Sequence, residues 1–282
     1  MTSDPSDVAI LAGAGRLPVE AATRLRRSGK PALVVAVAPE PDPELARQAG
    51  ACHRVDVGQW DEVKRRLREG GARKVVLLGK VPKTSLYHAP LDAGIRRLLD
   101  GLRARNDDAI LGALVNDLAA LGLEVLPQAW AVPHLVMPEG QLTRSGASPE
   151  EQQDVALGFT VARAIAGLDL GQTVVLRGRA VTAVEAIEGT DACILRGGAL
   201  AGDGAVVVKV RKPAQDPRFD LPTMGLDTLA VAQRAGVRVL ALEAGEALLV
   251  DREAVIQAAD EAGICLLGIR EEQARAWGSG SA

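Results

Sequence analysis

The chain has 282 residues, enough for one or two domains with buried cores, and its formal net charge at pH 7 is −3. This near-neutral charge and the small number of aromatic residues argue against nucleic-acid binding and against a polybasic membrane patch. No apolar run reaches the ~18 residues of a membrane span, and the first residues lack a signal-peptide pattern, so we expect a cytoplasmic protein. The three cysteines and three histidines have neither disulfide-framework nor zinc-ligand spacing.

The first half of the chain alternates apolar segments with segments of helical pattern. Strands are expected at residues 8–11, 31–37, 75–78 and 123–126, and helices at 18–29, 59–69 and 93–121. Asn106, Asp107 and Asp108 are candidate helix caps within the last of these stretches. Strands that alternate with helices predict a parallel, Rossmann-like sheet.

Prolines at 127, 133 and 138 interrupt this pattern, so we place a linker at residues 133–140. It separates an N-terminal domain, residues 1–133, from a C-terminal domain, residues 138–272. Beyond it, Ser148 and Pro149 begin a helix that should end at Gly167. Strands are then expected at 173–176, 180–187, 205–210, 237–242, 247–250 and 264–268, and helices at 226–235 and 251–262. The predicted fold class is α/β, a Rossmann-like domain followed by a mixed α/β domain.

A basic cluster followed by a proline-rich acidic loop is the strongest functional signal. Lys209, Arg211 and Lys212 end an apolar run, and Asp216 and Asp220 follow within the loop. The cations suit phosphate oxygens, and either carboxylate could bind a hard divalent cation. The alternative is a solvated loop between a strand and a helix.

Two further segments are candidate ligand sites. Gly13, Ala14 and Gly15 precede a predicted helix, where backbone N–H groups favour an anion, although Pro18 replaces the last glycine of a dinucleotide fingerprint. A tight turn that needs glycine explains this loop equally well.

Glu185 and Glu188 lie on the strand predicted at 180–187 and at its end, three residues apart, so they should face opposite sides. We therefore expect only one of them to reach a site shared with Asp191, and we favour Glu188, because the chain turns immediately after it. Thr190 is also a candidate for a plain helix cap, with Asp191 in the first turn.

Several motifs resemble those of the LpxI family, the UDP-2,3-diacylglucosamine pyrophosphatases of lipid A biosynthesis. V-E-A-x-E-G-T-D at residues 184–191 is followed by K-x-x-K-P-x-Q-D-x-R-x-D-L-P-T-x-G at 209–225. Further matching segments lie at 11–20, 107–111 and 248–253, so the resemblance spans nearly the whole chain in order.

The resemblance implies hydrolysis of UDP-2,3-diacylglucosamine to 2,3-diacylglucosamine 1-phosphate (lipid X) and UMP, with Mg²⁺ or Mn²⁺ as cofactor. Catalytic roles would belong to Asp220, Asp191 and Glu188, and Asp220 would bind the metal. The substrate-binding residues would be Gly13, Ala14, Gly15, Gly189, Thr190, Lys209, Arg211, Lys212 and Thr223. A cleft between the domains would hold the acyl chains. A homodimer and transient contact with the inner-membrane surface are also expected.

Two other classes of function are alternatives. A non-catalytic sugar-nucleotide binding or regulatory module would keep the glycine loop and the cations but would show no metal-dependent turnover. A nicotinamide oxidoreductase ranks last, because its glycine fingerprint is incomplete and Glu40, the candidate ribose-binding acid, lies between two prolines. The D-x-H opening of a calcineurin-type phosphoesterase is absent from the sequence.

Overall fold

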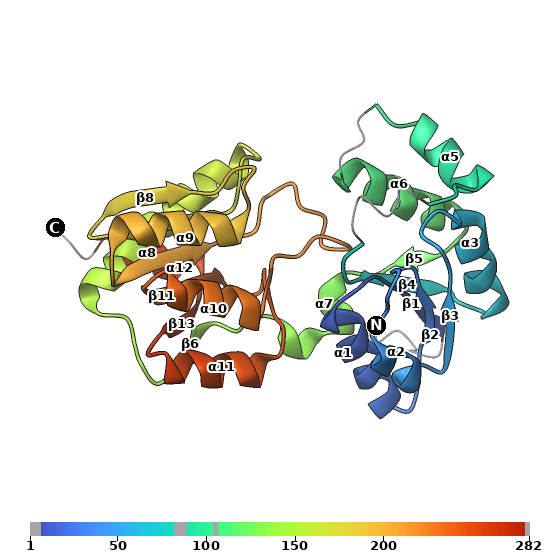
Figure 1. Ribbon diagram of the computed structural model, residues 1–282, viewed down its shortest axis with the longest axis horizontal. Coiled ribbons are helices and arrows are strands. Elements are labelled where there is room, and N and C mark those ends of the chain that lie inside the picture. Colours follow the sequence, from blue (N-terminus) through green and yellow to red (C-terminus); the bar gives the residue numbers. More distant parts are fainter. Residues whose placement is uncertain (1–6, 82–88, 104–106, 280–282) are drawn as a thin grey trace. The chain divides into compact units, whose positions relative to one another are not determined.

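The computed structural model describes residues 7–81, 89–103 and 107–279, and its contacts divide the chain into two compact units (Figure 1). One unit comprises Met1–Pro133 and Pro217–Phe219, and the other comprises His134–Asp216 and Asp220–Ala282. A short piece of the predicted acidic loop thus belongs to the first unit, where the Gln128 N–H donates to the Pro217 carbonyl at 2.9 Å. Among the described residues, no helix is both long and apolar enough to cross a membrane.

The first unit is built on a parallel five-stranded sheet of order β3-β2-β1-β4-β5. Its strands are β1 (Val8–Ala12), β2 (Leu33–Ala36), β3 (Ala51–Arg54), β4 (Lys74–Leu78) and β5 (Glu124–Val125). Its helices are α1 (Arg16–Arg27), α2 (Pro43–Gln48), α3 (Trp60–Glu69), α5 (Ala93–Asp100), α6 (Asp107–Ala120) and α7 (Gln128–Ala131). Short apolar strands with helices on both faces are typical of this doubly wound arrangement.

Side-chain alternation divides the core of this unit between the two faces of the sheet. Ala9 and Leu11 of β1 pack with Trp60 of α3 and with residues of α5 and α6. The intervening Ile10 is fully buried and belongs to the opposite side of the strand. Both faces of β1 are therefore covered, which explains its continuous apolar sequence.

The second unit has a six-stranded mixed sheet of order β6-β13-β11-β9-β7-β8. Its strands are β6 (Gly140–Gln141), β7 (Thr173–Arg177), β8 (Ala180–Val184), β9 (Ala205–Lys209), β11 (Val237–Glu243) and β13 (Cys265–Ile269). A separate parallel pair joins β10 (Thr223–Met224) to β12 (Leu248–Leu249). The helices are α8 (Pro149–Gly167), α9 (Thr190–Ala201), α10 (Leu226–Arg234), α11 (Arg252–Glu261) and α12 (Glu271–Ser279), and the short η2 (Pro133–Leu135) spans the point in the chain where the second unit begins.

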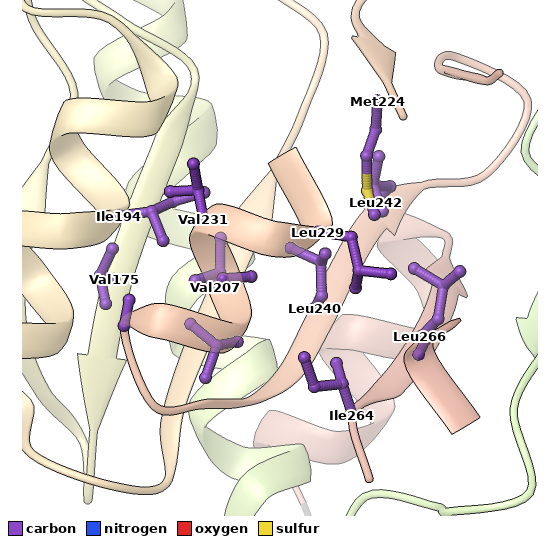
Figure 2. Packing of buried hydrophobic residues seen from close by; sticks show 14 of the residues in the cluster. Val175, Ile194, Val207, Met224, Leu229, Val231, Leu240, Leu242, Ile264 and Leu266 are labelled. Atoms are coloured by element: carbon purple, nitrogen blue, oxygen red, sulfur yellow. The ribbon is translucent and has the colours of Figure 1, made fainter. Parts of the chain in front are cut away.

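Two apolar clusters cover the faces of this sheet. Ile194 of α9 and Leu229 of α10 pack with Val207 and Leu240 on one face (Figure 2). Phe159 of α8 packs with residues of β7, β9 and β11 on the other. Burial of a leucine or phenylalanine side chain typically stabilises a fold by about 1.5–3 kcal/mol, so these layers hold the strand ends in place.

The predicted fold class, a Rossmann-like parallel domain plus a mixed α/β domain, is confirmed. The helix predicted from Ser148 is also confirmed, because Ser148 and Glu151 form a capping box before α8. The strand predicted through Ile187 is wrong, since β8 ends at Val184. Strand β3 was missed because its residues, Ala-Cys-His-Arg, form an edge strand that is mostly exposed rather than an apolar run. Asp251 precedes α11 as predicted, but its side chain makes no capping hydrogen bond.

Candidate active site

A group of polar side chains gathers at the carboxyl end of β9. Strand β7 runs antiparallel to β9, so Thr173 at its start pairs with Lys209 at the end of β9. Thr190 is the first residue of α9, and Glu185 immediately follows β8. Four segments that are separated in sequence therefore bring Thr173, Glu185, Thr190 and Lys209 to one edge of the sheet.

Hydrogen bonds connect three of these side chains in series. The Lys209 ammonium donates to Thr190 Oγ1 at 3.1 Å, and the Thr190 hydroxyl donates to Glu185 Oε1 at 3.0 Å. Lys209 and Glu185 are each 8% exposed. A buried cation and a buried carboxylate thus share one hydroxyl at the amino end of a helix, where the helix dipole is positive.

Glu185, rather than the favoured Glu188, is the acid that lies beside Thr190. Glu188 sits in the turn after β8, and its carboxylate accepts from Arg196 Nη2 at 2.5 Å. Hydrogen bonds from its own backbone N–H and from Arg196 lower the pKa of Glu188. Because β8 ends at Val184, Glu188 lies in the turn that was expected after the strand, and its role at a site shared with Asp191 stays a prediction.

The other residues predicted in this segment are placed as follows. Gly189 is the N-cap residue of α9 with φ of +82°, a left-handed conformation that favours glycine. Asp191 lies in the first turn of α9, exposed, and accepts from Thr228 Oγ1 at 3.3 Å. Thr223 begins β10, and its hydroxyl donates to the Leu221 carbonyl at 3.1 Å.

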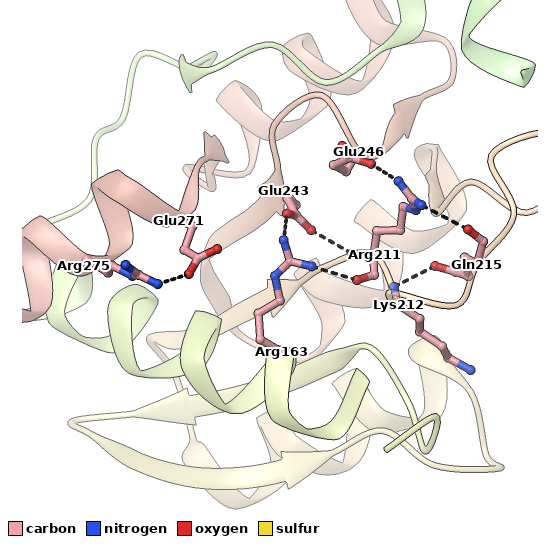
Figure 3. Close-up of polar contacts among 8 residues, drawn as sticks. All are labelled: Arg163, Arg211, Lys212, Gln215, Glu243, Glu246, Glu271 and Arg275. Carbon is pink, nitrogen blue, oxygen red and sulfur yellow. Dashed lines mark hydrogen bonds and ion pairs between the residues drawn. The ribbon is translucent and has the colours of Figure 1, made fainter. Parts of the chain in front are cut away.

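The three predicted cations have different partners. Arg211 forms an ion pair with Glu246 at 2.5 Å and donates to the Gln215 carbonyl at 3.1 Å (Figure 3). Lys212 forms an ion pair with the exposed Asp169 at 2.9 Å. Lys209 donates a hydrogen bond to Thr190. The three cationic side chains therefore each contact a different partner within the protein.

Gln215 links the basic cluster to Asp220, a connection that the sequence did not reveal. Its Oε1 accepts from the Lys212 N–H at 2.9 Å, and its Nε2 donates to Asp220 Oδ2 at 2.8 Å. The Asp220 N–H also donates to the Asp216 carbonyl at 2.9 Å. Gln215 is only 9% exposed, so its side chain has little freedom to move. Its amide therefore holds the Asp220 carboxylate at a fixed position relative to the backbone of Lys212.

Glu243, at the end of β11, is a second residue that the sequence did not reveal. It pairs with Arg163 of α8 and accepts from the Arg211 N–H at 2.9 Å (Figure 3). Burial raises the pKa of Glu243, while the hydrogen bond from the Arg211 backbone opposes that change. The available signal was a glutamate immediately after the buried strand predicted at 237–242, since a buried carboxylate needs partners.

The glycine loop of the first unit is a backbone structure. The Gly13 N–H donates to the Leu78 carbonyl at 2.7 Å, and the Ala14 N–H donates to the Lys80 carbonyl at 2.8 Å. Gly15 precedes α1 with φ of +99°. Because two of the N–H groups expected to meet an anion already have partners, the tight-turn reading explains Gly13 and Ala14 in this structure.

The described residues contain no group of three or more His, Cys, Asp and Glu side chains placed to hold a metal ion. Mg²⁺, however, commonly binds through one or two carboxylates together with substrate phosphates and water. Asp220, held through one oxygen by Gln215, fits that pattern as a single protein ligand. The residues present are thus compatible with a metal that the substrate helps to bind.

Known proteins and protein families are similar to this chain over nearly its full length. The LpxI N-terminal domain model matches residues 7–135, and the LpxI C-terminal domain model matches residues 138–267. The UDP-2,3-diacylglucosamine pyrophosphatase LpxI of Caulobacter vibrioides is 35% identical over 276 residues, which cover 94% of this chain and 98% of that protein. The chain therefore belongs to the LpxI family.

Proposed function

We propose that this protein hydrolyses UDP-2,3-diacylglucosamine to lipid X and UMP. Water forms a new P–O bond at one phosphorus and the bridging P–O bond of the diphosphate breaks, which gives two phosphate monoesters. The two protons of the water are released as both monoesters ionise to dianions. The observation that carries the proposal is the polar cluster at the end of β9, in a chain that aligns over 94% of its length with a pyrophosphatase of this name.

The phosphate groups would meet Lys209 and the amino end of α9. The ammonium supplies a full positive charge, and the first turn of α9 adds the partial charges of its N–H groups. Arg211 and Lys212 would add further positive charge, from backbone positions set by Glu243 and Gln215. Cations that are held in place before the substrate binds stabilise the negative charge that develops in the transition state.

Asp220 would hold Mg²⁺ or Mn²⁺ together with the diphosphate. Such an ion, when bound, neutralises phosphate charge and assists an in-line displacement. The contribution of Asp220 is a carboxylate that Gln215 keeps in one orientation, with Oδ2 occupied by the amide. Asp191 and Glu188 remain proposed contributors, and their positions near the start of α9 place them outside the hydrogen-bonded series of Lys209, Thr190 and Glu185.

The reaction is tested with the purified protein, UDP-2,3-diacylglucosamine in detergent micelles and Mg²⁺. Release of UMP and lipid X at equal rates is expected, and the position of ¹⁸O from labelled water identifies the phosphorus atom that is attacked. Tight binding without release of UMP would instead support a non-catalytic sugar-nucleotide module.

The acyl chains should determine specificity. Burial of acyl chain is favourable by roughly 0.8 kcal/mol per CH₂, so we expect kcat/KM for the diacylated substrate to exceed that for UDP-N-acetylglucosamine by more than ~100-fold. Equal efficiency would reduce the proposal to a general nucleotide-sugar pyrophosphatase.

Transient contact with the inner-membrane surface is part of the proposal because the substrate is a lipid. Flotation with liposomes of defined composition tests it. A homodimer is a further expectation, and light scattering of the purified protein measures it directly.

A further inference from the structure

We propose that Glu185 is a positioning residue of the phosphate site. Its carboxylate holds the Lys209 ammonium in place through the hydroxyl of Thr190. The inference rests on the proposed function and adds to it a residue that acts without touching the substrate. It concerns how the cation is kept in position, not which groups react.

The direction of each hydrogen bond follows from the chemistry of the three groups. An ammonium only donates, and an ionised carboxylate only accepts. Thr190 Oγ1 must therefore accept from Lys209, and its single proton must point to Glu185 Oε1. The carboxylate thus sets the orientation of the hydroxyl, and the hydroxyl in turn offers its lone pair to the ammonium.

Glu185 is itself fixed to the sheet. Its Oε2 accepts from the Gln172 N–H at 3.2 Å, and its own N–H donates to the Thr173 carbonyl at 2.9 Å. A Cβ added at Gly171 would overlap the carbonyl oxygen of Glu185, so the chain packs against this residue as closely as glycine allows. The start of β7 therefore holds Glu185, and Glu185 transmits that position to Thr190 and Lys209.

Burial gives the carboxylate an electrostatic role. Lys209 and Glu185 are both 8% exposed, and a charge with so little contact with water depends on nearby charges and hydrogen bonds. Loss of the negative charge would favour a Lys209 side chain that leaves its position. That change weakens a phosphate site that depends on a fixed ammonium.

The decisive variant is Glu185→Gln, which keeps the shape and an acceptor for Thr190 but removes the charge. We expect kcat/KM to fall by about 10- to 100-fold, the range common for residues one contact away from a site. Glu185→Asp keeps the charge with a shorter side chain and should recover part of the activity.

Asp154→Asn is the matched control, because Asp154 is also a buried carboxylate. It is 4% exposed and accepts from the backbone N–H groups of Gly178 at 2.8 Å and Arg179 at 2.5 Å, in the hairpin between β7 and β8. This variant should lower the melting temperature while leaving kcat/KM of the folded protein unchanged. An equal loss of kcat/KM in both variants would show that Glu185 is merely structural and would overturn the inference.

Two further measurements test the route through Thr190. If Glu185 acts through that hydroxyl, Glu185→Gln combined with Thr190→Val should lose no more kcat/KM than the more damaging single change, whereas fully additive losses would overturn the inference. Thr190→Ser, which keeps the hydroxyl, should retain more activity than Thr190→Val.

The third measurement does not depend on turnover. Acetylation of Lys209 by a water-soluble acylating reagent, followed by mass spectrometry, should be several-fold faster in Glu185→Gln than in the parent or in Asp154→Asn. Unchanged reactivity would overturn the inference. If the parent protein shows no hydrolysis at all, the proposed function fails, while the reactivity of Lys209 still decides the role of Glu185.

Discussion

The glycine loop after β1 and the polar edge after β9 both follow buried strands, but different atoms form them. In the first, the Gly13 N–H bonds to the Leu78 carbonyl, and Ala14 and Lys80 exchange two backbone hydrogen bonds at 2.8 and 2.9 Å. In the second, side chains of Glu185, Thr190 and Lys209 make the contacts. The first region is therefore sensitive to added volume, and the second is sensitive to loss of charge.

The largest effect should come from removal of divalent metal. If Asp220 and the diphosphate together bind the ion, excess EDTA should abolish turnover, and Mg²⁺ or Mn²⁺ should restore it. The far-UV circular dichroism spectrum should not change. The described residues contain no cluster of metal ligands, so the folding of neither unit depends on a bound metal there. Full turnover in EDTA, with metal content shown to be negligible, contradicts this part of the proposal.

Next in size is Asp220→Asn, which removes a charge from the loop after β9 but keeps the shape. Loss of several kcal/mol of transition-state stabilisation is expected, at ~1.4 kcal/mol per tenfold in rate. Since asparagine can still accept from Gln215, the free energy of unfolding should change by less than about 1 kcal/mol. A kcat within about threefold of the parent would remove Asp220 from the reaction.

Gly13→Ala tests the backbone character of the first region. Its Cβ would lie 2.7 Å from the Lys80 carbonyl oxygen and 2.8 Å from two further backbone atoms. Because backbone cannot move aside as a flexible side chain can, we expect a loss of about 1–3 kcal/mol in the free energy of unfolding, measured by urea denaturation.

Gly112→Ala is the control for that experiment. Gly112 lies inside α6, and an added Cβ would meet no atom within 4 Å. Alanine in an open helical position should stabilise the protein by about 0.5–1 kcal/mol. Destabilisation by both substitutions would show that the effect at residue 13 is not caused by the close approach to Lys80.

The smallest effect on folding stability is expected for Lys212→Ala. Its ion pair with Asp169 is largely exposed and contributes roughly 0–1 kcal/mol to folding. Its proposed role in phosphate binding predicts a larger effect on substrate, a rise in KM of about tenfold, or ~1.4 kcal/mol. A marked fall in melting temperature with unchanged KM would show that Lys212 is structural.

The sequence predictions were accurate where the interacting residues lie close together along the chain. The helix from Ser148 was predictable because the capping box joins residues three apart. The pairing of Arg211 with Glu246 was not predictable, because it joins residues 35 positions apart through the order of strands in the sheet. The end of β8 at Val184 rather than Ile187 was not predictable either, because tertiary packing decides where that strand stops.

Local sequence was thus sufficient for the two-part α/β architecture, for the basic cluster that begins at Lys209 and for the family resemblance. Apolar periodicity, helix caps and glycine turns act over a few residues, so their pattern can be read directly from the chain. Only the tertiary structure could show that Thr190 stands between Lys209 and Glu185 and that Gln215 holds Asp220. Those contacts arise because antiparallel pairing of β7 with β9 brings distant segments to one edge, and no local pattern encodes that register.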